Sequence, residues 1–289
     1  MTDFDEKIDR ETLERKKDLL PHMPQVLGEL QKRVENGDTD SQTLSELIGS
    51  DVGLVGKILR IVNSAYYQLP RKLSDLKFAI AYLGFAEIYR IVLTSSVVEQ
   101  LKVDGDDFER FWRHSFFTAL VARKLLTGVD AGVAMGELWP AALLHDVGEL
   151  VSMRLFPEEF NLVKEYINQH KCLVSEAEQA LDVVAHTALG ALLCEHWNLP
   201  DTVKDVCLHH ENLAAVDISA SHEIMTIRKV VMAADRMAKL ASMNISEKLQ
   251  DELRAQICSL LEVDEDGFLL AMAKAYEQRE EVDRFLADI

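Results

Sequence analysis

The sequence predicts an all-α protein, and three observations support this fold class. Gly and Pro are scarce, at 13 and 6 of 289 residues, which disfavours a turn-rich β fold. Hydrophobic residues make up 48% of the chain, enough for a large buried core. Hydrophobic residues also recur at helical spacing along most of the sequence, and polar breaks with N-cap residues separate the apolar stretches.

Residues 1–18 carry dense charges of both signs, so we expect a solvated charged N-terminal segment. Residues 19–103 are expected to form an N-terminal helical half. Its helices have short side chains suited to capping at their starts and turn formers at their ends. The predicted starts are Asp40, Asp51 and Asp75, and the predicted ends are Asn63 and Gly84.

The stretch VDGDD (103–107) is the best candidate boundary, and residues 104–245 are expected to form a second half. Its central feature is 139–156, which we predict to be one buried helix with Pro140 in its first turn. The other predicted helices of this half span 108–127, 160–169, 182–197, 201–210 and 222–241. Residues 246–289 are predicted to form two acidic amphipathic helices.

His145 and Asp146 lie side by side within the apolar stretch 139–156. Burying a carboxylate beside an imidazole costs several kcal/mol unless something compensates, and a metal ion can do so. A hydrogen-bonded His–Asp pair in the core is the alternative. For the dipeptide alone, the hydrogen-bonded pair is the favoured interpretation.

Other chemistry-bearing side chains lie on the apolar helices of the same half. Together with the dipeptide, the candidate metal ligands are His114, His145, Asp146, His186, His209, His210 and Asp235. Imidazoles and carboxylates gathered from several helices suit one or two ions of Zn, Fe or Mn. Asp146 could bridge two such ions, an arrangement that activates water toward phosphate esters, so we single it out as the candidate catalytic residue. The remaining histidines, among them His170, His196 and His222, are interpreted as ordinary.

Several other functions are disfavoured by the sequence. Residues 43–65 resemble a helix-turn-helix in outline, but the second helix offers only Lys57 and Arg60 to DNA. The net charge of −18 disfavours broad binding to nucleic acid or anionic lipid. No glycine-rich phosphate loop is present, and the acidic run 264–267 lacks the ligand spacing of an EF-hand.

No apolar run reaches the length of a membrane span, and the first residues do not have the shape of a signal peptide. The four cysteines form no CxxC pair. We therefore expect a cytoplasmic protein with reduced thiols and no membrane association.

The order of His114, the His145–Asp146 dipeptide and Asp235 resembles the HD superfamily of metal-dependent phosphohydrolases. More closely, the chain resembles the HDOD family, the HD-related output domain of bacterial signalling proteins, over about residues 19 to 240. The segments that carry this resemblance are Leu20–Pro21 with Pro24, Asp51 with Leu54, KILRIVNSAYY (57–67), AIAYLGF (79–85), WRHS (112–115), LLHDVG (143–148) and HWNLP (196–200).

The resemblance implies an all-α fold in which an N-terminal helical half packs on an HD-like half. It implies a first metal position at His114, His145, Asp146 and Asp235, and a second at Asp146, His186, His209 and His210. The expected cofactor is one or two divalent transition metal ions, Fe, Mn, Zn or Ni.

Two features depart from the related HD-GYP cyclic di-GMP phosphodiesterases. Those enzymes have Ile-Gly-Lys after the His-Asp pair, whereas this chain has Val147, Gly148 and Glu149. An acidic side chain there would repel a phosphate. The segment after Glu211, NLAAVDIS, also lacks the glycine-rich tyrosine-proline loop that holds cyclic di-GMP.

Two functions follow as hypotheses. The leading one is an interaction or output module that works with signalling proteins, keeps an HD-type metal site and has weak or no hydrolase activity. The alternative is a working phosphohydrolase that acts on a nucleotide or a phosphorylated small molecule.

Overall fold

The computed structural model describes residues 19–35, 40–63, 69, 71–103, 105–126, 135–217 and 220–286. These residues contain helices and no strands, so the predicted all-α fold is confirmed. The predicted charged segment 1–18 lies outside the described residues. The chain divides into two compact units, one formed by 21–102 with 279–289, and the other by 1–20 with 103–278.

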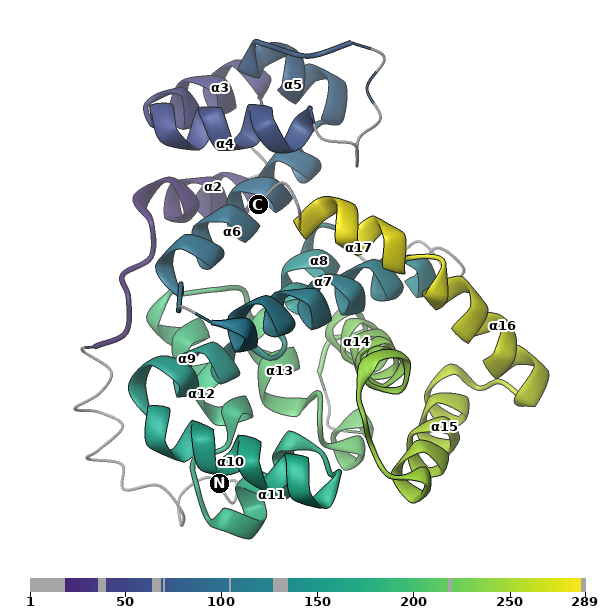
Figure 1. The fold of residues 1–289 in the computed structure, drawn as a ribbon. Helices are drawn as coiled ribbons and strands as arrows, with labels where there is room; N and C mark the ends of the chain where they lie inside the picture. The colour runs from purple at the N-terminus through teal and green to yellow at the C-terminus, as the bar shows by residue number, and fades with distance from the viewer. Residues whose placement is uncertain are drawn as a thin grey trace. The chain divides into compact units, whose positions relative to one another are not determined.

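The unit that begins at Pro21 contains the N-terminal helices. Its elements are α2 (Gln25–Glu35), α3 (Ser41–Gly49), α4 (Val52–Val62), α5 (Leu76–Leu83), α6 (Phe85–Gln100) and α17 (Arg279–Leu286). Within it, α3, α4 and α5 pack against one another, and α4 and α5 also pack on α6 (Figure 1).

The predicted helix starts of this unit are confirmed. The side chains of Asp40, Asp51 and Asp75 each accept a backbone N–H from the first turn of the helix that follows. Gly84 separates α5 from α6 with a φ of 83°, a conformation that favours glycine. Asn63 ends α4, and its side-chain amide donates to the carbonyls of Leu59 and Leu73, both at 2.7 Å.

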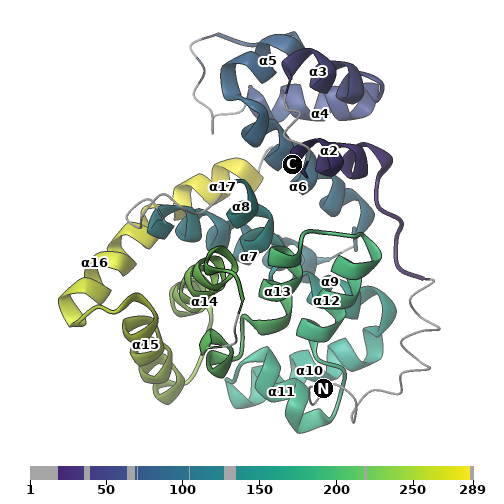
Figure 2. The same ribbon diagram turned by 180° about the vertical axis from the view of Figure 1, so that it is seen from behind.

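The unit that contains 103–278 carries the candidate ligands. Its helices are α7 (Asp106–Leu126), α8 (Met135–Leu144), α9 (Val147–Leu155), α10 (Pro157–His170), α11 (Val174–Leu181), α12 (His186–His196), α13 (Asp201–His209), α14 (His222–Ser242), α15 (Glu247–Leu261) and α16 (Glu265–Tyr276), with a short 3-10 turn at Leu213–Asp217. The long helices α7 and α14 pack against each other and against α8. Helices α9, α12 and α13 lie side by side, as the two opposite views show (Figures 1 and 2).

The predicted single helix over 139–156 is wrong. The structure has two helices there, α8 and α9, and His145 and Asp146 form the turn between them. Neighbouring residues of one continuous helix would point about 100° apart, so the break allows both side chains to face one centre. Helix α8 also begins at Met135, earlier than predicted, which places Pro140 inside it rather than in its first turn.

Two further boundaries differ from the prediction. The helix expected over 182–197 begins at His186, and the short helix α11 precedes it. The described part of the last region, 246–286, contains three helices, α15, α16 and α17, where two were predicted over 246–289. Helix α15 packs on α14, with Leu260 of α15 buried against Met232 and Ala233 of α14.

Gly148 marks the closest approach of α9 to α12. A Cβ atom on Gly148 would lie 1.8 Å from the carbonyl oxygen of His186 and 2.6 Å from the backbone nitrogen of Gly190. Both atoms belong to the backbone of α12, so they cannot turn away as a side chain can. Glycine at 148 therefore permits the helix contact that places His186 close to the 145–146 turn.

We predict that Gly148→Ala lowers the free energy of unfolding by about 1 to 3 kcal/mol, because the added methyl group forces α9 and α12 apart. Gly56→Ala is the control, since a Cβ atom there meets nothing within 4 Å. That control should leave stability unchanged or raise it by up to about 1 kcal/mol. Urea unfolding of both variants measures the difference. Equal stability of Gly148→Ala and the wild type would contradict the close helix contact.

Candidate metal centre

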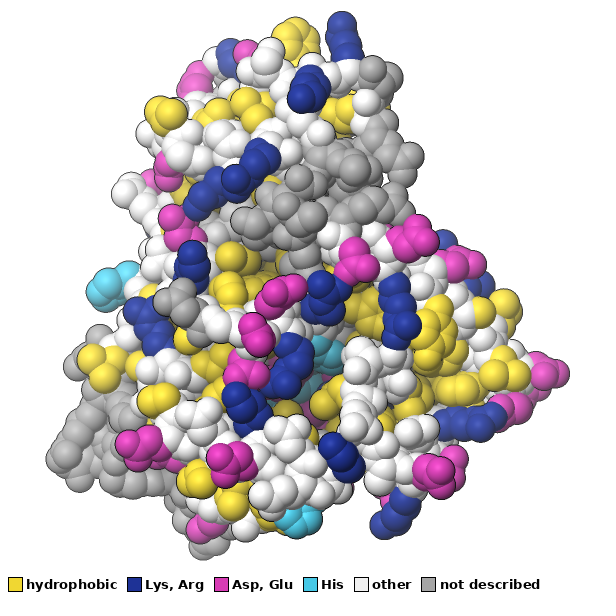
Figure 3. All heavy atoms as spheres, viewed as in Figure 1, with side chains coloured by type: hydrophobic (Ala, Val, Ile, Leu, Met, Phe, Trp, Pro, Cys, Tyr) yellow, Lys and Arg dark blue, Asp and Glu magenta, His cyan; other side chains and the backbone are white. Residues whose placement is uncertain are grey.

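Five elements bring six of the seven predicted ligands to one place. His114 lies in the middle of α7, and His145 and Asp146 form the α8–α9 turn. His186 is the first residue of α12, His210 directly follows α13, and Asp235 lies on α14. Five of the six side chains are buried, and only the His114 side chain, 16% exposed, reaches solvent. On the face shown in Figure 3, histidine atoms lie in a hollow that both basic and acidic side chains border.

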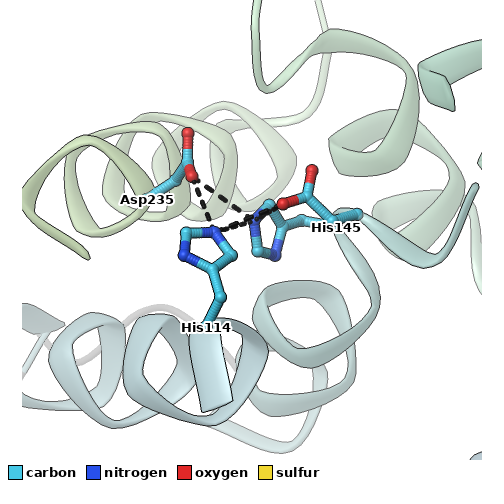
Figure 4. A group of neighbouring side chains, drawn as sticks. His114, His145 and Asp235 are labelled. Carbon is cyan, nitrogen blue, oxygen red and sulfur yellow. Dashed lines mark hydrogen bonds and ion pairs between the residues drawn. The ribbon is translucent and has the colours of Figure 1, made fainter. Parts of the chain in front are cut away.

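The first group consists of His114, His145, Asp146 and Asp235. His114 Nε2 lies 3.1 Å from Asp235 Oδ1, 3.2 Å from Asp146 Oδ2 and 3.3 Å from His145 Nε2. Figure 4 shows the His114 and His145 rings and the Asp235 carboxylate turned toward one another. The ligand atoms of the group all lie within 4.8 Å of one another, a spacing that one metal ion could span.

The second group consists of Asp146, His186 and His210. Asp146 Oδ1 lies 2.8 Å from His210 Nε2 and 3.4 Å from His186 Nε2. The two ring nitrogens are 3.4 Å apart. Asp146 therefore faces the first group with Oδ2 and the second with Oδ1.

The hydrogen-bond partners of His145 and His210 leave Nε2 of each ring free to bind a metal. The outer ring nitrogen of His145 lies 2.8 Å from the Ala142 carbonyl, and that of His210 lies 3.2 Å from the carbonyls of Val206 and Cys207. A carbonyl can only accept, so in each ring Nδ1 carries a proton. In a neutral ring the Nε2 atom that faces the centre then carries a lone pair, as a metal ligand must.

Asp146 Oδ1 provides a second sign of the same fit. This oxygen is buried, and its near neighbours are the Nε2 atoms of His210 and His186, which carry lone pairs rather than protons when the rings are neutral with Nδ1 protonated. Lone pairs that face one another in a buried site cost free energy, whereas a cation between Oδ1 and the two imidazoles would satisfy all three atoms. The residues present therefore fit a divalent transition metal at either position, and Zn, Fe, Mn and Ni all accept mixed imidazole and carboxylate ligands.

The electrostatics of the centre favour positive charge. Burial alone would lower the pKa of His145, but the carboxylates of Asp146 and Asp235 outweigh this effect and raise it to about 10. The pKa of Asp146 is held well below its usual range, because the neighbouring His145 and His210 offset its burial. A metal held by His145 Nε2 would have to displace the proton there, so its binding would release protons at neutral pH.

Glu149 lies close enough to interact with the centre. Burial and the nearby Asp146 carboxylate raise the pKa of Glu149 to about 7. The side chain is half-buried in the first turn of α9. At neutral pH a substantial part of the Glu149 population therefore carries a negative charge beside Asp146.

His209 is not brought into either group. It is the last residue of α13, and adjacent helical positions differ by about 100°, so His209 and His210 cannot both face Asp146 from one helix. Its ring is half-buried, and its charged neighbours are Asp205 and Arg228. Those two side chains form a two-point ion pair at 2.7 Å.

Sequence reasoning missed the buried charges behind the ligands. Glu178 of α11 accepts hydrogen bonds from the backbone N–H and the ring Nδ1 of His186, both at 2.9 Å. Lys239 of α14 donates to Asp235 Oδ2 at 2.8 Å and to Glu211. The four-residue spacing of Asp235 and Lys239 on an apolar helix was a usable signal for an ion pair. Nothing in the sequence marks Glu178.

Comparison with known proteins identifies relatives of the chain. The sequence model of the HDOD domain matches residues 20–213. A protein without an assigned function from Treponema pallidum (strain Nichols) is 26% identical over 196 residues, which are 68% of this chain and 38% of the relative. The chain thus spans well under half the length of that relative.

Two crystal structures share the fold. One is a protein from Shewanella amazonensis SB2B, provisionally named a phosphohydrolase, with 23% identity, 95% of this chain and 97% of that chain covered, and a TM-score of 0.73. The other, from Marinobacter aquaeolei VT8, is provisionally named a signal transduction protein. It has 18% identity, coverage of 96% of this chain and 61% of that chain, and a TM-score of 0.76.

Among the described residues, no helix has both the length and the apolar character needed to cross a bilayer.

We predict that metal removal destabilises the protein and that Asp146→Ala abolishes this response, because both positions use Asp146. Binding at a free metal concentration 100 times Kd contributes about 2.7 kcal/mol. In a domain of this size, chelation should then lower Tm by about 5 to 10 °C. Thermal melting with and without chelator measures this in both proteins, with circular dichroism as the check on helical content. Equal chelator responses would mean that Asp146 holds no metal.

A second prediction distinguishes the neighbouring histidines. His210→Ala should remove one of the bound ions, because His210 Nε2 faces Asp146 Oδ1. His209→Ala should keep the wild-type metal content, because its ring stands outside both groups. Elemental analysis of the two purified variants measures this. Loss of metal in both variants would restore the ligand set that the sequence predicted, which contains both histidines.

Proposed function

The chain belongs to the HDOD domain family, and from this membership and the geometry of the centre we propose that it is an interaction or output module of bacterial signalling with weak or no hydrolase activity. In this proposal the six ligands hold one or two transition metal ions. His209, predicted as a seventh ligand, is left out because its ring stands apart from Asp146.

The observation that carries the low activity is the position of Glu149. Its carboxylate interacts with Asp146, and the pKa of about 7 leaves it largely ionised above neutral pH. A phosphate ester brought to the centre would meet this negative charge, which opposes binding. A cation at this position would attract the same group.

The buried lysine near the centre does not compensate for Glu149. The Lys239 ammonium is paired with Asp235 and Glu211, and the side chain is only 5% exposed. Moving it toward a phosphate would leave both carboxylates with less compensation. Lys239 therefore acts on the protein's own acidic groups.

Signalling proteins are the proposed partners, and we propose that they bind to the unit that begins at Pro21. Arg60 near the end of α4 is exposed and is the candidate contact residue. Asn63, one turn later, is occupied by hydrogen bonds with Leu59 and Leu73 and has a structural role. A cytoplasmic location is part of the proposal, and the four free cysteines support it.

A working phosphohydrolase is the second candidate function. The specific observation in its favour is the pair of ligand groups joined by Asp146, because two adjacent ions can polarise a phosphate ester and activate water. A nucleotide or a phosphorylated small molecule would be the substrate. The provisional name of the Shewanella amazonensis protein agrees with this alternative, but a likeness at 23% identity supports the fold alone.

We predict that protein loaded with Mn²⁺ or Fe²⁺ shows no more turnover of nucleoside phosphates or cyclic di-GMP than the Asp146→Ala variant. Glu149→Lys should strengthen binding of inorganic phosphate to the loaded protein, because it replaces repulsion with attraction, whereas Glu149→Gln should have a smaller effect. Chromatography of the products and calorimetric titration with phosphate measure these outcomes. Steady turnover by the wild type that Asp146→Ala abolishes would establish the hydrolase alternative instead.

A further inference from the structure

We propose that Glu178 is a positioning residue for the second metal position, formed by Asp146, His186 and His210, and that it determines whether the centre holds one ion or two. This inference rests on the metal centre of the proposed function. Glu178 makes no contact with an ion in this proposal and acts through His186.

Glu178 holds His186 at two points. Its Oε1 accepts the backbone N–H of His186, and its Oε2 accepts the ring Nδ1–H, both at 2.9 Å. The carboxylate is buried, with 5% of the residue exposed, so water competes little for these bonds. Two fixed points on one residue set both the position of the backbone and the rotation of the ring, and Nε2 is thereby directed at Asp146 Oδ1.

The location of His186 explains why it needs an external partner. His145 and His210 place Nδ1 against carbonyls three or four residues earlier in the chain. His186 is the first residue of α12, so no preceding turn of that helix offers it a carbonyl. The carboxylate of Glu178 takes that place from the neighbouring helix α11.

The charge of Glu178 adds to its positional effect. An ionised carboxylate behind a ligating imidazole makes the ring a stronger donor than a neutral carbonyl does. Behind the first position the buried charged group is a cation: the Lys239 ammonium lies 2.8 Å from Oδ2 of the ligand Asp235. Glu178 is thus an anion behind a ligand of the second position, and Lys239 is a cation behind a ligand of the first. Removing the charge of Glu178 should therefore weaken the second position selectively.

Helix α11 also contacts the network behind the first position, but less directly. Ser175, one turn before Glu178 and on the same side of α11, donates to Glu211 at 3.2 Å. Glu211 in turn pairs with Lys239. Ser175 is thus linked to Asp235 only through Glu211 and Lys239, whereas Glu178 hydrogen bonds directly with the ligand His186.

Glu178→Gln keeps the shape of the side chain and removes its ability to satisfy both donors. A glutamine has one accepting oxygen, and its amide group can only donate. Either the backbone N–H of His186 then faces another donor, or Nδ1 must give up its proton. In the second case a neutral ring carries its proton on Nε2 and has no lone pair for a metal.

The experiment uses the full chain, stripped with chelator and titrated with Mn²⁺. Calorimetry measures the number of ions and the two dissociation constants, and electron paramagnetic resonance distinguishes a coupled pair of ions from a single one. For the wild type we expect two ions and the coupled signal. For Glu178→Gln we expect the second dissociation constant to rise about 10- to 100-fold, with the first unchanged and the coupled signal lost.

Two further variants make the result specific. Glu176→Gln removes the same charge from the same helix, but at an exposed residue whose side chain accepts the backbone N–H of Leu173. This variant should bind two ions with the wild-type dissociation constants. Glu178→Asp keeps the charge on a shorter side chain, so it should partly restore the coupled signal. If Glu178→Gln fails to fold by circular dichroism, the weakening of the second ion in Glu178→Asp decides the question.

The possible outcomes distinguish a failure of the proposed role of Glu178 from a failure of the metal centre. If the wild type binds none of the four proposed metals, Mn²⁺ included, the metal centre itself is overturned. Two ions with unchanged affinities in Glu178→Gln would overturn the role of Glu178 and leave the centre intact. A wild type that holds one ion, or a Glu178→Gln variant that loses both, would also overturn the selective control proposed here.

Discussion

Two buried carboxylates determine how this part of the chain is built. Asp146 and Asp235 are almost completely shielded from solvent, and neither could remain ionised there without positive charge or strong donors around it. Four imidazoles and one lysine ammonium supply that environment, and each comes from a different place in the chain. The helix break at 145–146, the start of α12 at His186 and the close contact at Gly148 all bring donors to these two carboxylates.

The sequence predicts much of this arrangement because caps and apolar spacing are local signals. Asp40, Asp51 and Asp75 cap helices as expected, since a short acidic side chain before an apolar repeat has few other structural uses. The break between α8 and α9 could not be predicted in the same way. Hydrophobic residues continue on both sides of it, and the reason for the break lies in contacts with α7, α12 and α14.

The residue types of the ligands could be predicted from the sequence, but the side of each helix on which a ligand lies could not. His209 and His210 are equivalent in the sequence, and only the placement of α13 determines which ring meets Asp146. Glu178 was hidden for a related reason. It is one of 49 acidic residues, and it lies on a helix of eight residues, which is shorter than the stretch over which helical spacing is read. Its partner His186 follows eight residues later, beyond the range of helical spacing.

The partial exposure of His114 makes the first group the part of the centre that solvent reaches most. Among the six ligands, His114 alone has a side chain that solvent reaches to a substantial extent, at 16% exposure. An ion held by the first group would therefore be open to water on the side of His114. His186, His210 and Asp146, which form the second group, are almost completely buried, so an ion held there would have less access to water. Two ions held with equal affinity would then differ in how readily water replaces their protein ligands.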